Sequence, residues 1–296
     1  MGGIAFARFL PQDFVMNSSS HALRAGASVQ RAPGMFAGAW RRRELLVQLT
    51  IREIETYFRG SWLGKIWAVV VPLFMLGMYT LVFGVVLHVH WPGKERNEWE
   101  MALLYFAGLI LSTFFVESIT RAALLVQQTP SFVKKVVFPL EILPWVLVGG
   151  TLFRAAIAAG VLAVYYLALE GLPPWSAVTV PLAVAPLALI TVGLCWIFAA
   201  IGVFVRDLRH AMAIVMPAMM FLAPIFFPLS AVPESVRPIF LLNPLTFPVE
   251  TIRAALFFGT WPNWWGLAAY AVISLIVARL GFTIFQRLRP TFADVI

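Results

Sequence analysis

Long apolar runs alternate with short polar segments along this chain of 296 residues. A helix needs about 20 mainly apolar residues to cross the hydrocarbon core of a bilayer, and several of the runs reach that length. The pattern therefore predicts an all-α polytopic membrane protein with six transmembrane helices. The predicted spans are 66–87, 101–126, 142–169, 176–204, 211–227 and 264–285.

The segment before the first span has a different pattern. Between residues 40 and 65, apolar positions such as Leu45 and Leu49 alternate with charged positions at helical spacing. This spacing predicts an amphipathic helix that lies in the membrane interface. Residues 1–39 lack it, and we expect a poorly ordered cytoplasmic extension there. The chain is thus divided into the extension 1–39, the interface helix 40–65 and the transmembrane domain 66–296.

The segment between the fifth and sixth spans, 228–263, is too apolar for an aqueous loop and too rich in proline for one straight helix. Non-helical backbone survives at membrane depth only where protein or a water-filled cavity surrounds it. We therefore predict short re-entrant helices that close the outward end of the protein. The residues assigned to this exit gate are Phe227, Pro228, Pro244 and Pro248.

Composition and charge agree with a membrane protein. The chain is 61% hydrophobic and 12% charged, whereas soluble domains are about 25% charged, which argues against a soluble enzyme. Its net charge of +8 requires no nucleic-acid partner, because cytoplasmic loops of membrane proteins accumulate Lys and Arg. These residues are concentrated in 1–65, 127–139, 205–211 and 285–296. The positive-inside rule then places both termini in the cytoplasm.

The sequence lacks the chemistry of an enzyme. A phosphate-binding loop needs Gly-Lys followed by Ser or Thr, and neither Gly-Lys pair of the chain has that residue after it. Any energy from ATP must come from a separate ATPase. His88 and His90 have no third ligand nearby, so no metal site is expected.

Three charged residues fall inside predicted spans. Glu117 and Arg121 are four residues apart and share one helix face, and Arg154 lies in the next span. They form either a mutually neutralising ion pair at a helix boundary or a buried contact that holds the second and third spans together.

Aromatic residues make up 14% of the chain. Those inside the first and fifth spans are candidates for lining a sugar pathway, because aromatic faces stack on sugar rings, although helix packing is the more common role. These candidates are Phe74, Tyr79, Phe83, Phe221 and Phe226.

Four stretches of the chain together resemble a known family, the ABC-2 type permeases that export polysaccharides. The first two stretches are GSWLGKIWAVVVP at 60–72 and FVKKVVFPLEILP at 132–144. The third combines PIFFP and LNPLT within 224–246, and the last is FQRLRPTFADV at 285–295. The chain is more similar to exporters of O-antigen and teichoic acid than to capsule exporters.

The resemblance implies a homodimer of six-span subunits joined to two ATPase subunits in the cell inner membrane. It implies export of a polyprenyl-diphosphate-linked polysaccharide from the cytoplasm outward. ATP and Mg²⁺ would be bound by the ATPase partner, and no cofactor is expected on this chain. O-antigen, capsular polysaccharide and teichoic acid remain alternative substrates.

Two cytoplasmic surfaces are large enough for an ATPase to push against: the interface helix, and the basic segment between the second and third spans. The coupling candidates are Ser131, Phe132, Lys134, Lys135 and Val136, with Glu44, Arg52, Glu53 and Tyr57 as second contacts. Topology and attraction to lipid headgroups are the alternative role for the two lysines. A diphosphate would be attracted to an entrance formed by Arg59, Trp62, Leu63, Gly64 and Lys65.

Two alternatives belong to other classes of protein. An ion-coupled secondary carrier would need more intramembrane carboxylates than Glu117, and usually internal repeats. A membrane glycosyltransferase would need paired carboxylates in a large loop. Co-purification with an ATPase separates these alternatives from an ABC permease.

Overall fold

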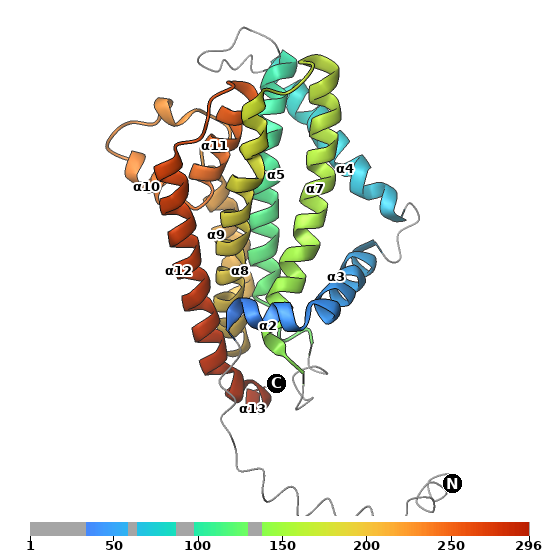
Figure 1. The fold of residues 1–296 in the computed structure, drawn as a ribbon, viewed down its shortest axis with the longest axis vertical. Helices are drawn as coiled ribbons and strands as arrows, with labels where there is room; N and C mark the ends of the chain where they lie inside the picture. The colour runs from blue at the N-terminus through green and yellow to red at the C-terminus, as the bar shows by residue number, and fades with distance from the viewer. Residues whose placement is uncertain (1–33, 59–63, 87–97, 130–137, 296) are drawn as a thin grey trace, which may run out of the picture.

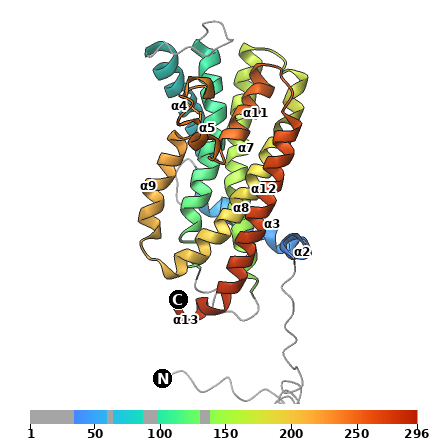
Figure 2. The same ribbon diagram turned by 90° about the vertical axis from the view of Figure 1, so that its left-hand side faces the viewer.

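The computed structural model of the chain describes residues 34–58, 64–86, 98–129 and 138–295. Every regular element in these ranges is helical. Four helices in this part of the chain are long and apolar enough to cross a membrane, and they pack along the long axis of the molecule (Figures 1 and 2). They are α5 (Glu98–Ala122), α7 (Leu143–Leu169), α8 (Val180–Phe204) and α12 (Trp264–Leu288).

Local sequence sets the starts of these helices. Pro144 and Pro181 lie in the first turns of α7 and α8, where the missing N–H of proline costs no helical hydrogen bond. Short 3-10 turns precede both helices: η3 (Leu140–Ile142) and η4 (Trp175–Thr179). Helix α12 begins after Asn263, whose Oδ1 accepts a hydrogen bond from the backbone N–H of Gly266 at 3.2 Å.

Helices α8 and α12 pack closely through small residues. A Cβ added at Gly281 of α12 would lie 2.1 Å from the carbonyl oxygen of Gly193 in α8. The backbones therefore touch at this crossing, as small residues allow between membrane helices. One turn away from Gly193, the fully buried Trp196 meets the ring of Phe282 edge to face, with centroids 5.2 Å apart.

The first and fifth predicted spans are shorter or less regular than expected. Helix α4 (Trp67–Tyr79) contains Pro72 and continues as a π-helix, η2 (Thr80–Val86). Helix α9 (Leu208–Phe221) has 14 residues, about 21 Å at 1.5 Å per residue, which is less than the roughly 30 Å hydrocarbon core. The described residues thus contain four full-length helices and two shorter apolar ones, rather than six equivalent spans.

Short helical pieces replace a single helix between α9 and α12, as the prolines predict. They are η5 (Leu229–Ala231), α10 (Arg237–Leu241) and α11 (Thr246–Phe257). Helix α11 packs against α5 and α8, at the end of the bundle opposite to the C-terminus (Figure 1).

The predicted interface helix is broken and begins earlier than expected. Helix α2 (Met35–Arg41) begins within the segment assigned to the N-terminal extension, and α3 (Arg43–Phe58) follows after a break at Arg42. The turn η1 (Gly64–Ile66) precedes α4. Helix α2 lies across the same end of the bundle as η6 (Arg289–Thr291) and α13 (Phe292–Val295) (Figure 1). The described chain therefore starts and finishes at one end of the molecule.

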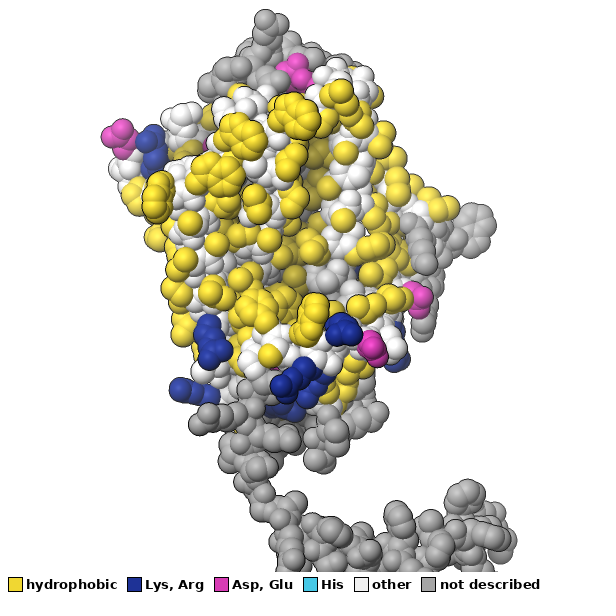
Figure 3. Space-filling view, in the orientation of Figure 1, with side chains coloured by type: hydrophobic (Ala, Val, Ile, Leu, Met, Phe, Trp, Pro, Cys, Tyr) yellow, Lys and Arg dark blue, Asp and Glu magenta, His cyan; other side chains and the backbone are white. Residues whose placement is uncertain are grey.

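The surface separates apolar from basic residues. On the face shown in Figure 3, hydrophobic side chains extend along the bundle, and Lys and Arg gather near the end that carries α2 and α13. An apolar belt with basic residues gathered at one end is typical of a membrane protein.

Candidate functional site

A network of four charged side chains connects α3, α5 and α7 near the basic end of the bundle. Glu117 of α5 is paired with Arg154 of α7, and its carboxylate lies 3.4 Å from Arg121 one turn further along α5. Arg121 is in turn paired with Glu53 of α3. The structure thus brings together Glu117, Arg121 and Arg154, and adds Glu53, which the sequence analysis did not include in this group.

The network is only partly shielded from solvent. The Arg154 side chain is 12% exposed and that of Glu117 is 25% exposed. The guanidinium of Arg154 also lies over the ring of Tyr57, 4.1 Å from its centroid, a cation–π contact that further fixes α3 on α7. Two acidic and two basic groups balance, so the network has no net charge to attract an anion.

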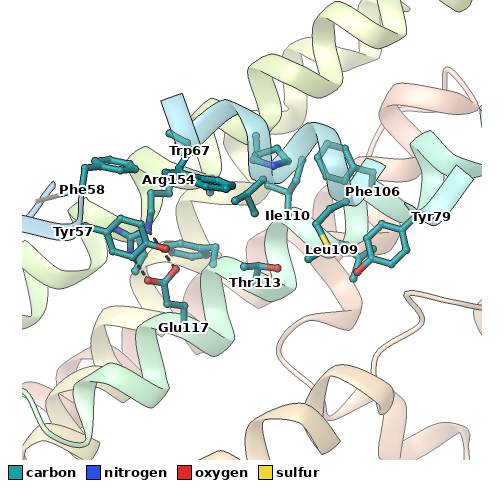
Figure 4. A pocket seen from close by; sticks show the side chains of 18 residues that line it. Tyr57, Phe58, Trp67, Tyr79, Phe106, Leu109, Ile110, Thr113, Glu117 and Arg154 are labelled. Carbon is teal, nitrogen blue, oxygen red and sulfur yellow. Dashed lines mark hydrogen bonds and ion pairs between the residues drawn. The ribbon is translucent and has the colours of Figure 1, made fainter. Parts of the chain in front are cut away.

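A pocket of about 280 Å³ lies between α3, α4, α5 and α7, with the charged network at one end. Figure 4 shows Tyr57, Glu117 and Arg154 converging at that end and Tyr79 and Phe106 at the other. The walls between them are mainly apolar. Such a pocket suits an amphipathic or apolar molecule. Further lining residues include Trp67, Pro72, Leu109, Ile110 and Thr113.

The coupling candidates do not all face the same way. Glu44 and Arg52 are exposed on α3. Glu53 instead directs its carboxylate to Arg121 and packs against Gly150 of α7. The helical period places consecutive residues about 100° apart, which explains why Arg52 and Glu53 separate. The candidates Ser131, Phe132, Lys134, Lys135 and Val136 lie outside the described residues.

The entrance candidates are described in part. Gly64 begins η1 with φ +50, in the left-handed region that glycine adopts without strain. No atom lies within 4 Å of a Cβ built there. Lys65 contributes its backbone to η1, but its side chain lies outside the description, as do Arg59, Trp62 and Leu63.

The aromatic candidates differ in exposure. Phe74 of α4 and Phe221 of α9 are 63% and 65% exposed, respectively. Phe226 is partly buried, with its ring centroid 6.3 Å from that of Tyr105 and 5.9 Å from that of Phe221. Tyr79 lines the pocket described above. The side chain of Phe83 lies outside the described residues.

The exit-gate candidates lie in the short helical pieces near α10 and α11. Phe227 packs edge to face on Phe240 of α10, with centroids 5.7 Å apart. The carbonyl of Pro244 accepts a hydrogen bond from the Tyr270 hydroxyl of α12 at 2.8 Å. Pro248 is buried in the first turn of α11, and Pro228 directly precedes η5. These contacts hold the segment against the bundle.

Arg253 is a residue of this region that the sequence analysis did not single out. It is 2% exposed, and its Nε donates to the Leu104 carbonyl of α5 at 2.9 Å. Its two terminal nitrogens donate to the carbonyls of Pro224 and Ile225, where the chain turns after α9. The available signal was an arginine in the mainly apolar run that follows Pro248, since buried arginines must find acceptors.

Within the described ranges, no group of three or more potential metal ligands occurs. His88 and His90 lie outside those ranges. Cys195 is fully buried in α8.

Comparisons with known proteins agree with these features. A model of the family described as "ABC-2 type transporter" matches residues 44–257. A relative from Myxococcus xanthus, "O-antigen export system permease protein RfbA", is 29% identical over 256 residues, which cover 86% of this chain and 96% of the relative.

Two further relatives are more distant. A protein of the same name from Klebsiella pneumoniae is 25% identical and covers 86% of this chain and 95% of itself. "Polysialic acid transport protein KpsM" of Escherichia coli is 23% identical, covering 80% of this chain and 91% of its own. Because the family model matches most of the chain, this protein belongs to the ABC-2 type transporter family.

Proposed function

We propose that the chain is the permease subunit of an ATP-driven exporter, which moves a polyprenyl-diphosphate-linked polysaccharide of O-antigen type outward across the inner membrane. The observation that carries the proposal is the near full-length match to relatives named as O-antigen export permeases. The apolar helical bundle and the absence of a phosphate-binding loop in the sequence also support a transport subunit that relies on a separate ATPase.

The proposed topology has six spans with both termini in the cytoplasm. The four long helices form four of these spans. The other two are α4 continued by η2, and α9 continued by the turn that follows it. Short or interrupted helices are tolerated in membranes where neighbouring protein satisfies the backbone. The basic end in Figure 3 is then the cytoplasmic end, and the segment with α10 and α11 is re-entrant from the outside.

The proposed assembly is a homodimer bound to two ATPase copies, which hold ATP and Mg²⁺. Phe74 of α4 and Phe221 of α9 are largely exposed in the single chain. Their exposed rings are therefore available to line a pathway that the two subunits of the homodimer share. Tyr79, Phe83 and Phe226 are proposed to extend that lining. Residues 131–136, with Glu44 and Arg52, are proposed to contact the ATPase, and residues 59–65 to admit the diphosphate.

A capsular polysaccharide is the second candidate substrate, because KpsM also matches most of the chain. Inverted membrane vesicles containing the chain and its ATPase test both. Glycans carried on polyprenyl diphosphate or on a different lipid anchor are placed on the outer face, ATP is added, and protection from an added glycosidase is measured.

ATP-dependent protection of the polyprenyl-diphosphate glycan, lost with a hydrolysis-deficient ATPase, is the expected result. Preference for the other anchor would favour the capsule-type substrate. Protection driven by an ion gradient without ATP would support a secondary carrier and contradict the proposal.

A further inference from the structure

A second cluster of charges joins three segments that are far apart in the sequence. The Glu141 side chain, in η3, is 5% exposed. Its Oε1 accepts a hydrogen bond from Arg42 Nη1 at 2.5 Å, and its Oε2 accepts one from Arg289 Nη1 at 2.9 Å. We call Arg42, Glu141 and Arg289 the Glu141 clamp.

The clamp also fixes the backbone around Glu141. Arg289 donates through Nη2 to the carbonyl of Phe138 at 3.1 Å, and the buried Trp196 of α8 donates through Nε1 to the carbonyl of Glu141 at 3.1 Å. Phe138 directly follows the stretch 130–137 in sequence. The chain leaving that stretch is therefore held by the C-terminal segment and by α8 before it enters α7.

On the N-terminal side, Arg42 occupies the break between α2 and α3. Its φ of −114 and ψ of 25 end α2. Helix α2 also rests on α7 through Phe36, whose ring centroid lies 6.1 Å from that of Trp145, and Trp145 in turn contacts Trp196 at 5.7 Å. The clamp and this aromatic row fix α2 on the bundle.

Stability alone does not explain such a cluster. Removing a carboxylate from water costs free energy that its ion pairs only partly recover, and apolar residues of similar volume often stabilise a protein equally well. Directional hydrogen bonds from two guanidinium groups fix the relative position of the segments that they join, which apolar contacts do not.

We propose that Glu141 is a positioning residue for coupling. Through the clamp it makes three segments move as one unit: the chain after residues 131–136, the α2–α3 pair and the C-terminal η6–α13 segment. This inference rests on the proposed function, in which an ATPase acts on residues 131–136. A displacement of that stretch then reaches α3 and α12 together, rather than being absorbed in a flexible loop.

The main test uses the complete complex of chain and ATPase in vesicles, with ATP hydrolysis and polymer transport measured on the same preparation. Glu141→Gln keeps the size of the side chain and removes its charge. We expect about tenfold fewer polymers transported per ATP, equivalent to about 1.4 kcal/mol of lost positioning, with assembly and hydrolysis within about twofold of wild type. The matched control Glu55→Gln, at an exposed position of α3 outside the proposed ATPase contacts, leaves the ratio unchanged.

Arg289→Gln provides a second variant, because it leaves Arg42 on Glu141, and we expect a smaller loss. Its control is Arg287→Gln, which changes an exposed arginine outside the clamp. An unchanged ratio of transport to hydrolysis in both clamp variants overturns the inference. So does a proportional fall of both activities with the amount of folded complex, because that result assigns the clamp to folding alone.

A measurement independent of transport keeps the two proposals distinguishable. Spin labels at Ala37 in α2 and Val295 in α13, both exposed, report the distance across the clamp after Cys195 is replaced. We expect a narrow distance distribution in the otherwise wild-type chain and a clearly broader one with Glu141→Gln. Equal widths contradict the clamp even where transport is normal, whereas failure of wild-type transport contradicts only the proposed function.

Discussion

Glu117 is the residue through which α5 is linked electrostatically to its neighbour α7. It pairs with Arg154 and Arg121, and Arg121 extends the network to Glu53 of α3. The i, i+4 relation of Glu117 and Arg121 was predictable from helical spacing. The pairing of Glu53 with Arg121 joins residues 68 positions apart, and no periodic pattern in one sequence encodes such a distance.

Replacing Glu117 with Gln tests the energetic role of this network. The change leaves Arg154, 12% exposed, without its carboxylate. We expect a loss of about 1–3 kcal/mol in stability, between the values for exposed and buried ion pairs. Thermal unfolding of the purified chain in detergent measures it. Glu44→Gln is the control, and an equal effect of both changes would show that the network adds nothing.

At the scale of the elements, the sequence predicted the long helices well. Their apolar runs are continuous, so α7 and α12 begin within one residue of the predicted starts at 142 and 264. The break at Arg42 was missed, because the helical spacing from residue 40 to residue 65 runs through it and the break is associated with the contact to Glu141. The early end of α9 at Phe221 was missed for a related reason, since the buried Arg253 binds the carbonyls that follow it.

The contact between α8 and α12 gives a prediction for paired helices. Gly281→Ala places a methyl group 2.1 Å from the Gly193 carbonyl oxygen, so the helices must separate. We expect a loss of about 1–3 kcal/mol, seen as a lower unfolding temperature. Gly160→Ala in α7 is the matched control, because no atom lies within 4 Å of the added methyl. Equal stability of the two variants would contradict the packing described here.

The outward segment gives a second prediction at this scale. Single cysteines introduced from 229 to 247, with Cys195 replaced, are treated with a membrane-impermeant thiol reagent in intact cells. We expect protection of positions packed against the bundle, such as Asn243, which is 5% exposed, and labelling of Leu242, which is 85% exposed. Uniform labelling would indicate a free external loop, and complete protection would indicate an additional span.

At the scale of the whole molecule, the pattern of apolar runs and Lys and Arg residues was sufficient to predict a helical membrane protein. The arrangement of the charged networks was not predictable in the same way, because Glu141 pairs with residues 99 and 148 positions away. Both networks lie at the basic end of the bundle, where α2, α3 and the C-terminal segment meet. An ATPase acting at that end would therefore act on segments that are already joined to one another.

We propose that this chain carries a polysaccharide outward only when a separate ATPase hydrolyses ATP. Its most direct test measures polysaccharide on the surface of cells lacking the native exporter, supplied with the chain, the ATPase, both, or both with a hydrolysis-deficient ATPase. We expect surface polysaccharide only with the chain and the active ATPase together. Export by the ATPase without the chain, or by the chain with the inactive ATPase, would contradict it.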